Sequence, residues 1–366
     1  MDRRFSRLTA LSCVLALLCV LFSGCHTATG SETVYQRFTR RSADIFDTEI
    51  MLSGFTTDEE SFQRISDEAF RRLAYYNQVF DGYNACDDLH NLYYINLHAA
   101  EGPVTIPEEL YDLLSWCREK WDGGLKCVNP AMGAVLSIWH DYRTAGIEDP
   151  ENAQLPPMEA LTAANAHTDF SCVILDAENK TVYYSDPELK IDVGAVAKGY
   201  AADLIRDYLE KEMPSFLLSL GGNVYAGEAP RDGRSAWAVA VQDPRADLLS
   251  GANGSDRLDI LDIASLSAVT SGDYWRFYVV DGQRYHHIID PETLMPSLSM
   301  QSVTIVCESS LLADYLSTTL FILSYEEGTA LIDGMEGVDA MWVLPDGSIR
   351  HSPGMERYAR SLRAVE

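Results

Sequence analysis

The first candidate site is a carboxylate and a hydroxyl that lie one helical turn apart. Asp314 and Thr318 occupy positions i and i+4 of residues 309–323, whose apolar spacing predicts a helix, so both side chains project from one face. Mg²⁺ prefers a few hard oxygen ligands and leaves its other positions to water and to substrate phosphate. The pair therefore fits a magnesium site, although an Asp and a Thr at this spacing more often hydrogen-bond or face water.

A lysine at the start of a second predicted helix forms another candidate site. Residues 192–203 read DVGAVAKGYAAD, where a strand ends and a helix over residues 196–209 begins. Gly194 and Gly199 permit close approach of the backbone, and the free N–H groups of the first turn, together with Lys198, favour an anion. A phosphate group suits this arrangement, and tight helix packing is the alternative reason for a glycine at such a position.

Two adjacent histidines supply a candidate proton carrier. His286 and His287 fall on a strand predicted over residues 285–289, and neighbouring strand residues point to opposite faces. At most one of them serves a given pocket, which argues against a metal site that uses both. One imidazole beside a carboxylate such as Asp290 can carry a proton or orient a neighbour; a strand-end histidine satisfied by Asp290 is the alternative.

The composition is that of a folded globular protein that does not bind nucleic acid. The chain has 366 residues, of which 47% are apolar and 23% charged, enough for one large or two average domains. Lys and Arg number 28 against 55 Asp and Glu, a formal net charge of -27, and such a surface repels nucleic-acid phosphates. Five cysteines of the body are odd in number and lack C-x-x-C spacing, which predicts neither a zinc site nor a fully paired disulfide framework: they are Cys86, Cys117, Cys127, Cys172 and Cys307.

The N-terminal residues have the features of an export signal. Three arginines precede an apolar stretch from Leu8 to Phe22, which is shorter than a membrane-spanning helix. Ser23-Gly24 directly before Cys25 resembles the lipobox of bacterial lipoproteins, so we expect cleavage after residue 24 and lipidation of Cys25; an uncleaved signal anchor is the alternative. Residues 25–37 would then be a tether, and residues 38–355 an extracytoplasmic domain held at the cell membrane.

The elements that must position these residues are helices and strands of one mixed unit. A capping-box pattern at Thr57 starts a helix that ends near Phe80, and a Pro107 start predicts a second helix that ends at Trp121. The remaining pattern is mostly strands, which favours an α+β fold with a largely antiparallel sheet. These strands are expected over residues 172–175, 181–184, 216–220, 237–242, 275–280, 285–289 and 302–306.

Taken in order, five motifs closely resemble those of the ApbE family of FAD:protein FMN transferases. They are Asp192-x-Gly-Ala-x-Ala-Lys198-Gly-Tyr-Ala-Ala-Asp203, Leu220-Gly-Gly-Asn223, Ser271-Gly-Asp-Tyr274, His287-Ile-Ile-Asp-Pro291 and Ala313-Asp314-x-x-x-Thr318. Looser matches are Phe46-Asp47-Thr48 for the family's Met-Gly-Thr, Phe80-Asp81-Gly82-Tyr83 for its Phe-Ser-x-Tyr, and Asn129 to Gly133 followed by Trp139 for its Asp-x-x-x-Gly and Trp. The resemblance extends from about residue 38 to residue 350.

The resemblance implies transfer of the FMN half of FAD, as a phosphoester, to a Thr or Ser hydroxyl of another exported or membrane protein, with release of AMP. By this match, Asp314, Thr318 and the backbone carbonyl of Ala195 hold Mg²⁺, and Lys198 approaches the pyrophosphate. His287 takes the proton of the acceptor hydroxyl, or holds the group that does, with Asp290 beside it. The flavin site is implied to be lined by Phe46, Tyr83, Asn129 and Ile289, with Tyr83 as the stacking surface.

Three positions depart from the family pattern, and two other activities stay open. Phe46 replaces a Met, Asn129 replaces an Asp, and Leu294 stands where a Gly is expected after Thr293. The implied acceptors are subunits of membrane redox complexes and exported flavin-carrying reductases. A Mg²⁺-dependent FAD pyrophosphatase that yields FMN and AMP, or a flavin-binding lipoprotein without turnover, remains an alternative.

Overall fold

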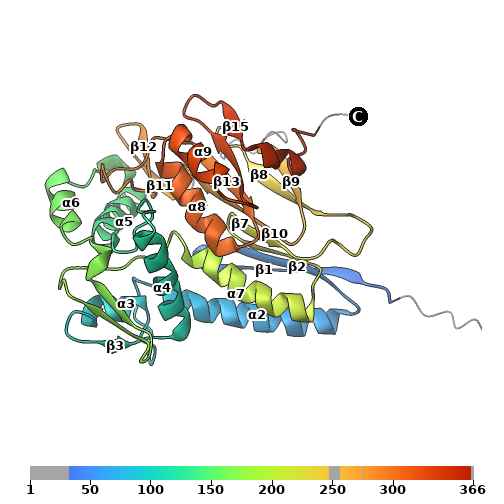
Figure 1. Cartoon of the computed structure of the whole chain (residues 1–366), viewed down its shortest axis with the longest axis horizontal. Helices are drawn as coiled ribbons and strands as arrows, with labels where there is room; N and C mark the ends of the chain where they lie inside the picture. The colour runs from blue at the N-terminus through green and yellow to red at the C-terminus, as the bar shows by residue number, and fades with distance from the viewer. Residues whose placement is uncertain (1–32, 247–255, 275, 364–366) are drawn as a thin grey trace, which may run out of the picture. The chain divides into compact units, whose positions relative to one another are not determined.

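An eight-stranded sheet forms the centre of the computed structural model, which describes residues 33–246, 256–274 and 276–363 (Figure 1). All neighbouring strands in it are antiparallel, which confirms the α+β class with a largely antiparallel sheet. In spatial order the strands are β1 (Gln36–Ile45), β2 (Thr48–Thr56), β6 (Phe216–Leu220), β7 (Asn223–Ala226), β10 (Leu266–Gly272), β13 (Ser302–Cys307), β14 (Asp339–Val343) and β15 (Ile349–His351).

Smaller sheets and eight α-helices complete the described residues. The small sheets are β3 (Val104–Thr105), β5 (Thr181–Tyr184) and β4 (Val173–Asp176); β8 (Trp237–Gln242) and β9 (Arg257–Ile263); and β11 (Phe277–Val280) and β12 (Gln283–His286). The helices are α2 (Glu59–Phe80), α3 (Leu92–His98), α4 (Glu108–Asp122), α5 (Gly133–Glu148), α6 (Met158–Asn165), α7 (Ala197–Glu212), α8 (Ser310–Ile322) and α9 (Tyr325–Asp333). Within the described ranges, no helix combines the length and the apolar character needed to cross a membrane.

Both faces of the central sheet are buried, by different elements. Side-chain alternation along β6 turns Leu218 and Leu220 toward a core shared with α2, α7 and α8, and turns Leu217 toward a second core shared with the β8–β9 hairpin. A strand covered on both faces is apolar along its whole length, which is why residues 216–220 were identifiable from sequence.

Helices α7 and α8 form the part of this fold that carries the candidate site. Figure 1 shows α8 beside α7, and α8 also packs on β10 and β13. Helix α8 is almost entirely buried, with apolar side chains on several faces, so its position is fixed by both the sheet and α7. A side chain that projects from α8 toward α7 is therefore held in place from two sides.

Several element boundaries differ from the sequence expectation, and the local contacts explain two of them. Helix α2 is capped by Asp58, whose Oδ1 accepts a hydrogen bond from Ser61 N at 2.8 Å, and not by the expected Thr57, whose hydroxyl donates to Asp58 instead. Strand β12 ends at His286, before the expected residue 289, because the chain turns there into a short bridge at Ile289. Trp275, residues 1–24 and Cys25 lie outside the described residues, so the signal, the lipidation and the domain boundaries stay predictions.

Candidate functional site

The carboxylate of Asp314 is held by the first turn of α7. Gly199 N donates a hydrogen bond to Asp314 Oδ2 at 2.8 Å. A Cβ at position 199 would lie 2.4 Å from Ser310 O and 2.6 Å from Asp314 Cβ, so only glycine allows the two helix backbones to approach this closely. Gly199 is therefore a close-packing residue and, through its N–H, a direct partner of the candidate metal ligand.

The buried carboxylate of Asp314 lies beside a positive charge but lacks full compensation. The residue is 5% exposed, and burial raises the pKa of Asp314, against the lowering effects of Lys198 and of the Gly199 N–H. Burial removes the water that would stabilise the charged carboxylate, and this is why its pKa rises. A cation bound beside the carboxylate would stabilise the charged form in place of that water. The site thus favours binding of a cation at Asp314.

Two other oxygen atoms that could bind a metal together with Asp314 make no hydrogen bond in the described chain. Gly199 N donates to Asp314 and not to Ala195 O. The carbonyl oxygen of Ala195 therefore accepts no hydrogen bond from any described residue. Thr318 follows Asp314 by one turn on the same face of α8. A carboxylate, a hydroxyl and a carbonyl are the hard oxygen ligands that Mg²⁺ takes. The described residues contain no cluster of three His, Cys, Asp or Glu side chains, so any metal here depends on this mixed set.

A buried amide faces the same carboxylate. Asn223 is 1% exposed, and it lies close enough to lower the pKa of Asp314, yet neither its Oδ1 nor its Nδ2 makes a hydrogen bond of normal geometry. The two-residue turn before it places Asn223: Gly221 and Gly222 have φ of 55° and 88°, and a Cβ on Gly221 would lie 1.8 Å from Thr48 Oγ1. An unpartnered buried amide is costly, so Asn223 points to a polar ligand at this position.

The two histidines have different surroundings, although His287 lies just beyond the end of β12 and not on the expected strand. His286 is 5% exposed; its Nε2 donates to Ser297 O at 2.9 Å, and its Nδ1 accepts from Ile288 N at 3.2 Å. His287 Nδ1 is buried and has no hydrogen-bond partner among the described residues. His286 is therefore a structural histidine, and His287 is the one with a free ring nitrogen.

Three cations surround His287. Burial lowers the pKa of His287 well below 6.5, and Arg276, His286, Arg143 and Lys198 lower it further. Lys198, Arg143 and Arg276 form no ion pair with any described carboxylate. In a chain of net charge -27, three unpaired cations around one neutral imidazole indicate a binding site for an anion.

A stacked aromatic pair lies next to these cations. Tyr83 stacks on His140 with ring centroids 4.3 Å apart, and its hydroxyl donates to Asp192 Oδ2 at 3.1 Å. The other oxygen of Asp192 accepts from Gly194 N at 2.7 Å, which ties the loop of Tyr83 to the segment before α7. Tyr83 is 46% exposed, so part of its ring remains free to contact a ligand.

The other residues implied for the flavin site are placed less directly. Phe46 has φ of 55°, and its carbonyl accepts from Arg276 Nη2 at 3.1 Å, which joins it to the cationic cluster. Asn129 braces its own loop, with Nδ2 donating to Thr168 O at 2.8 Å and Oδ1 accepting from Ala131 N at 2.9 Å. Ile289 is 5% exposed in an apolar core with Trp139. The flavin contacts of these three stay predictions.

The carboxylate of Asp290 is used within its own turn. Its Oδ1 accepts from Glu292 N at 2.9 Å and its Oδ2 from Thr293 Oγ1 at 3.1 Å. Leu294 completes this turn with φ of 61°, and Trp139 Nε1 donates to its carbonyl at 2.9 Å. The turn therefore forms without the expected glycine, and these contacts give Asp290 a local structural role, while a catalytic role stays a prediction.

Sequence reasoning missed three residues of this site and gave a fourth no role. Arg143, Arg276 and His140 belong to no quoted motif, and Asn223 was quoted only as the last residue of the motif Leu220-Gly-Gly-Asn223. The two arginines could have been noted from the sequence, because basic residues are in the minority in this acidic chain. What they approach is set by the tertiary fold, which no local pattern records.

Comparison with known proteins identifies the family. The ApbE family model matches residues 41–342. Over 288 residues the chain is 36% identical to a protein of Treponema pallidum named FAD:protein FMN transferase, which covers 74% of this chain and 75% of that protein. A Klebsiella pneumoniae protein of the same name is 30% identical over 311 residues, covering 84% of this chain and 90% of that protein.

Solved structures agree with these relatives. The crystal structure of the ApbE protein of Thermotoga maritima has a TM-score of 0.76 at 27% identity, and the match covers 89% of this chain and 100% of that one. A flavin transferase ApbE of Vibrio cholerae has the same fold, with a TM-score of 0.70 at 21% identity over 90% of this chain and 99% of that one. The chain belongs to the ApbE family.

Proposed function

We propose that this chain is a magnesium-dependent FAD:protein FMN transferase. A Thr or Ser hydroxyl oxygen of an acceptor protein bonds to the phosphorus of the FMN half of FAD, the P–O bond to the AMP half breaks, and AMP leaves. The observation that supports this best is the convergence of a buried carboxylate, Asp314, with Lys198 and Arg276, two cations that also surround the free imidazole of His287. The names of the relatives in Treponema pallidum and Klebsiella pneumoniae support the same reaction.

The residues present fit Mg²⁺. Asp314, Thr318 and the carbonyl of Ala195 are the donors that would hold it, with the unpartnered amide of Asn223 beside them. When bound, the ion supplies charge neutralisation at the diphosphate oxygens, which is the main requirement of phosphoryl-type transfer.

The side chains of the cluster divide the remaining work between binding and proton transfer. Lys198, Arg143 and Arg276 bind the diphosphate, since their charges have no carboxylate partner of their own among the described residues. The free ring nitrogen of His287 accepts the proton of the attacking hydroxyl. Burial, helped by the same cations, lowers the pKa of His287 and so keeps that imidazole neutral, which is the state a general base needs.

The pH profile of kcat/KM tests the state of His287. We expect no activity loss between pH 8 and 6.5, and an acid limb below pH 6.5, because the pKa of His287 in the folded protein lies well below that value. Below pH 6.5, His287 binds a proton in the unfolded chain but stays neutral in the folded chain. Acid therefore also lowers the free energy of unfolding. A loss of kcat/KM centred at or above pH 6.5, measured by AMP release where the protein stays folded, would contradict this assignment.

The flavin ring is proposed to stack on Tyr83. Replacing Tyr83 by Leu is expected to weaken FAD binding about 5-fold, since an aromatic pair is worth about 1 kcal/mol beyond its buried area. Fluorescence titration of FAD measures this, with Tyr83→Phe as the matched control that keeps the ring and loses only the hydroxyl contact to Asp192. Wild-type FAD affinity in the Leu variant would remove Tyr83 from the flavin site.

The acceptor and the cellular location are proposed from the sequence. The N-terminal features support export, lipidation at Cys25 and tethering of the catalytic body to the cell membrane. Acceptors are then subunits of membrane redox complexes or exported flavin-carrying reductases, which share that compartment.

One experiment tests the proposed reaction against its alternatives. The purified protein is incubated with FAD, Mg²⁺ and a candidate acceptor domain, the acceptor is weighed by mass spectrometry, and AMP is assayed. A covalent FMN adduct on the acceptor together with AMP supports the transferase. AMP with only free FMN would show a pyrophosphatase, and unchanged bound FAD would show a flavin carrier.

A further inference from the structure

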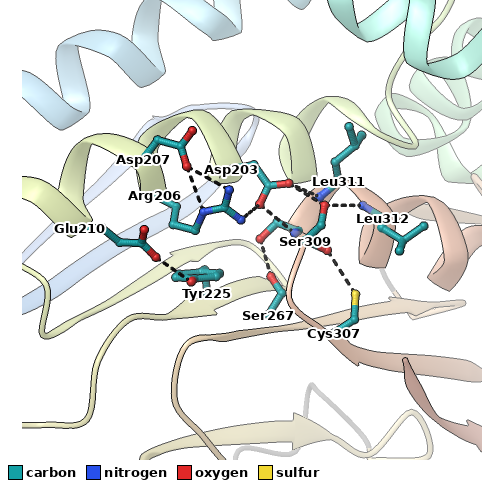
Figure 2. Close-up of polar contacts among 11 residues, drawn as sticks. Asp203, Arg206, Asp207, Glu210, Tyr225, Ser267, Cys307, Ser309, Leu311 and Leu312 are labelled. Carbon is teal, nitrogen blue, oxygen red and sulfur yellow. Dashed lines mark hydrogen bonds and ion pairs between the residues drawn. The ribbon is translucent and has the colours of Figure 1, made fainter. Parts of the chain in front are cut away.

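A second carboxylate, that of Asp203 on α7, lies at the N-terminus of α8, away from the metal ligands. Figure 2 shows Asp203 pointing at the first turn of α8. Its Oδ1 accepts from Ser310 N at 2.9 Å, and its Oδ2 accepts from Leu311 N at 3.0 Å and from Ser309 Oγ at 2.7 Å. A side chain of one helix thus serves as an N-terminal cap of another.

This contact accounts for the first N–H groups of α8. Ser309, the N-cap, accepts from Leu312 N at 3.2 Å, so Ser310, Leu311 and Leu312 all have a partner. Helix N-termini leave these groups unsatisfied and carry a partial positive charge, which a carboxylate stabilises. Removal of Asp203 would leave two of the N–H groups without an acceptor.

The carboxylate is itself held in place. Arg206 Nη1 donates to Asp203 Oδ1 at 2.8 Å and Arg206 Nη2 to Asp207 Oδ1 at 2.9 Å, as Figure 2 shows. The side chain of Asp203 is only 14% exposed, whereas that of Asp207 is 60% exposed. Asp203 therefore has four donors and little freedom, which suits a rigid link between two helices.

The link is in register with the metal ligands. Gly199 and Asp203 are one turn apart on α7, and their partners Asp314 and Ser310 are one turn apart on α8. Because residue numbers rise along α7 as they fall along α8, the two helices are antiparallel here. The same register, continued by one turn, leads to Ala195 and Thr318, the two other candidate ligands.

We propose that Asp203 is a positioning residue for the metal site: it fixes α8 against α7 so that Asp314 and Thr318 lie opposite the carbonyl of Ala195. The proposal rests on the proposed function for the identity of the metal ligands. Residues that orient metal ligands without touching the metal change metal affinity by about 10-fold to 100-fold when they are replaced. We expect an effect of this size from Asp203, although its contact with Ser310 lies about two helical turns from Thr318 along α8.

Binding of Mn²⁺ alone, measured by electron paramagnetic resonance on the full chain, tests this. Asp203→Asn replaces one carboxylate oxygen by an NH₂ group, which cannot accept a hydrogen bond from the N–H groups of α8. We expect the Kd of this variant for Mn²⁺ to rise about 10-fold. FAD affinity without metal, measured by fluorescence, should stay as in the wild type, since Asp203 lies away from the cations and Tyr83. Asp207→Asn is the matched control, because it shares Arg206 and has no contact with α8, and its Kd should not change.

Each outcome decides the proposal. Wild-type Mn²⁺ affinity in a folded Asp203→Asn protein would overturn it, as would an equal loss of Mn²⁺ and FAD affinity, which marks general destabilisation. If Asp203→Asn does not fold, Ser309→Ala decides in its place, since it removes one of the four donors to Asp203 together with the cap of Leu312 N at the same helix end, and unchanged Mn²⁺ affinity in it would overturn the proposal. A wild-type protein that binds Mn²⁺ but transfers no FMN counts against the proposed function alone.

Discussion

Replacing Asp314 by Asn is expected to abolish FMN transfer and FAD cleavage together while leaving the fold intact. The amide keeps an oxygen that can accept from Gly199 N, whereas Asp314→Ala would leave that buried N–H without a partner. What the Asn variant loses is the negative charge that a cation at this site requires. Since several kcal/mol of transition-state stabilisation depend on the cation, AMP release should fall about 10³-fold.

The neighbouring threonines provide a matched control on the same helix. Thr318→Val removes the hydroxyl proposed as a ligand, and it should raise the Mg²⁺ concentration needed for half-maximal AMP release. Thr319→Val makes the same change one residue on, where the hydroxyl donates to Tyr315 O at 2.9 Å inside the helix, and it should leave that concentration unchanged. Full AMP release by Asp314→Asn at wild-type Mg²⁺ levels would remove the metal role assigned to Asp314.

The sequence predicted best those elements whose pattern is determined by local spacing. Helix α2 has apolar residues at helical spacing along 22 residues, and strand β6 is apolar except at Ser219 because both of its faces are covered. Strand β1 was missed because it lies at the edge of the sheet and reads QRFTRRSADI, with three arginines and no run of buried side chains. An edge strand needs only one buried face, so composition alone does not reveal it.

The candidate site also has one part that local spacing in the sequence predicts and another part that it does not. Asp314 and Thr318 share a face because the helix period places them there, whereas His286 and His287 differ because β12 ends at His286 and the chain turns at His287. Asp290 follows His287 closely in sequence, and its role as a catalytic partner stays a prediction. Its carboxylate accepts from Glu292 N two residues on, because an Asp hydrogen-bonds readily to nearby backbone N–H groups.

Departures from the family pattern are compensated locally in this chain. Leu294 adopts φ of 61°, a conformation that favours glycine, and it is 6% exposed in an apolar core with Trp139 and Ile289. The strain of a non-glycine residue there is about 1 to 3 kcal/mol, and burial of a leucine side chain returns about 1.5 to 3 kcal/mol. The turn survives the substitution because its side chain packs.

His287→Ala is expected to reduce FMN transfer by about 10² to 10⁴-fold, the usual contribution of a positioned general base. FAD and Mn²⁺ affinities should change little, because Lys198, Arg143, Arg276 and Asp314 remain. Stability should also change little, since the buried Nδ1 of His287 has no hydrogen bond among the described residues to lose. Acceptor mass, AMP release and thermal unfolding measure the three properties.

For the adjacent histidine, His286, we expect the opposite result: a loss of stability with little loss of transfer. The comparison isolates the role of His287. His286→Ala leaves Ser297 O and Ile288 N without their buried partner, which should lower the free energy of unfolding by about 2 kcal/mol with most of the transfer rate retained below the unfolding temperature. Two side chains adjacent in sequence would then separate catalysis from stability, because His286 is hydrogen-bonded in the packed core and His287, just after the strand, lies near the cations. Equal losses of transfer and of stability in both variants would show that neither histidine acts as the base.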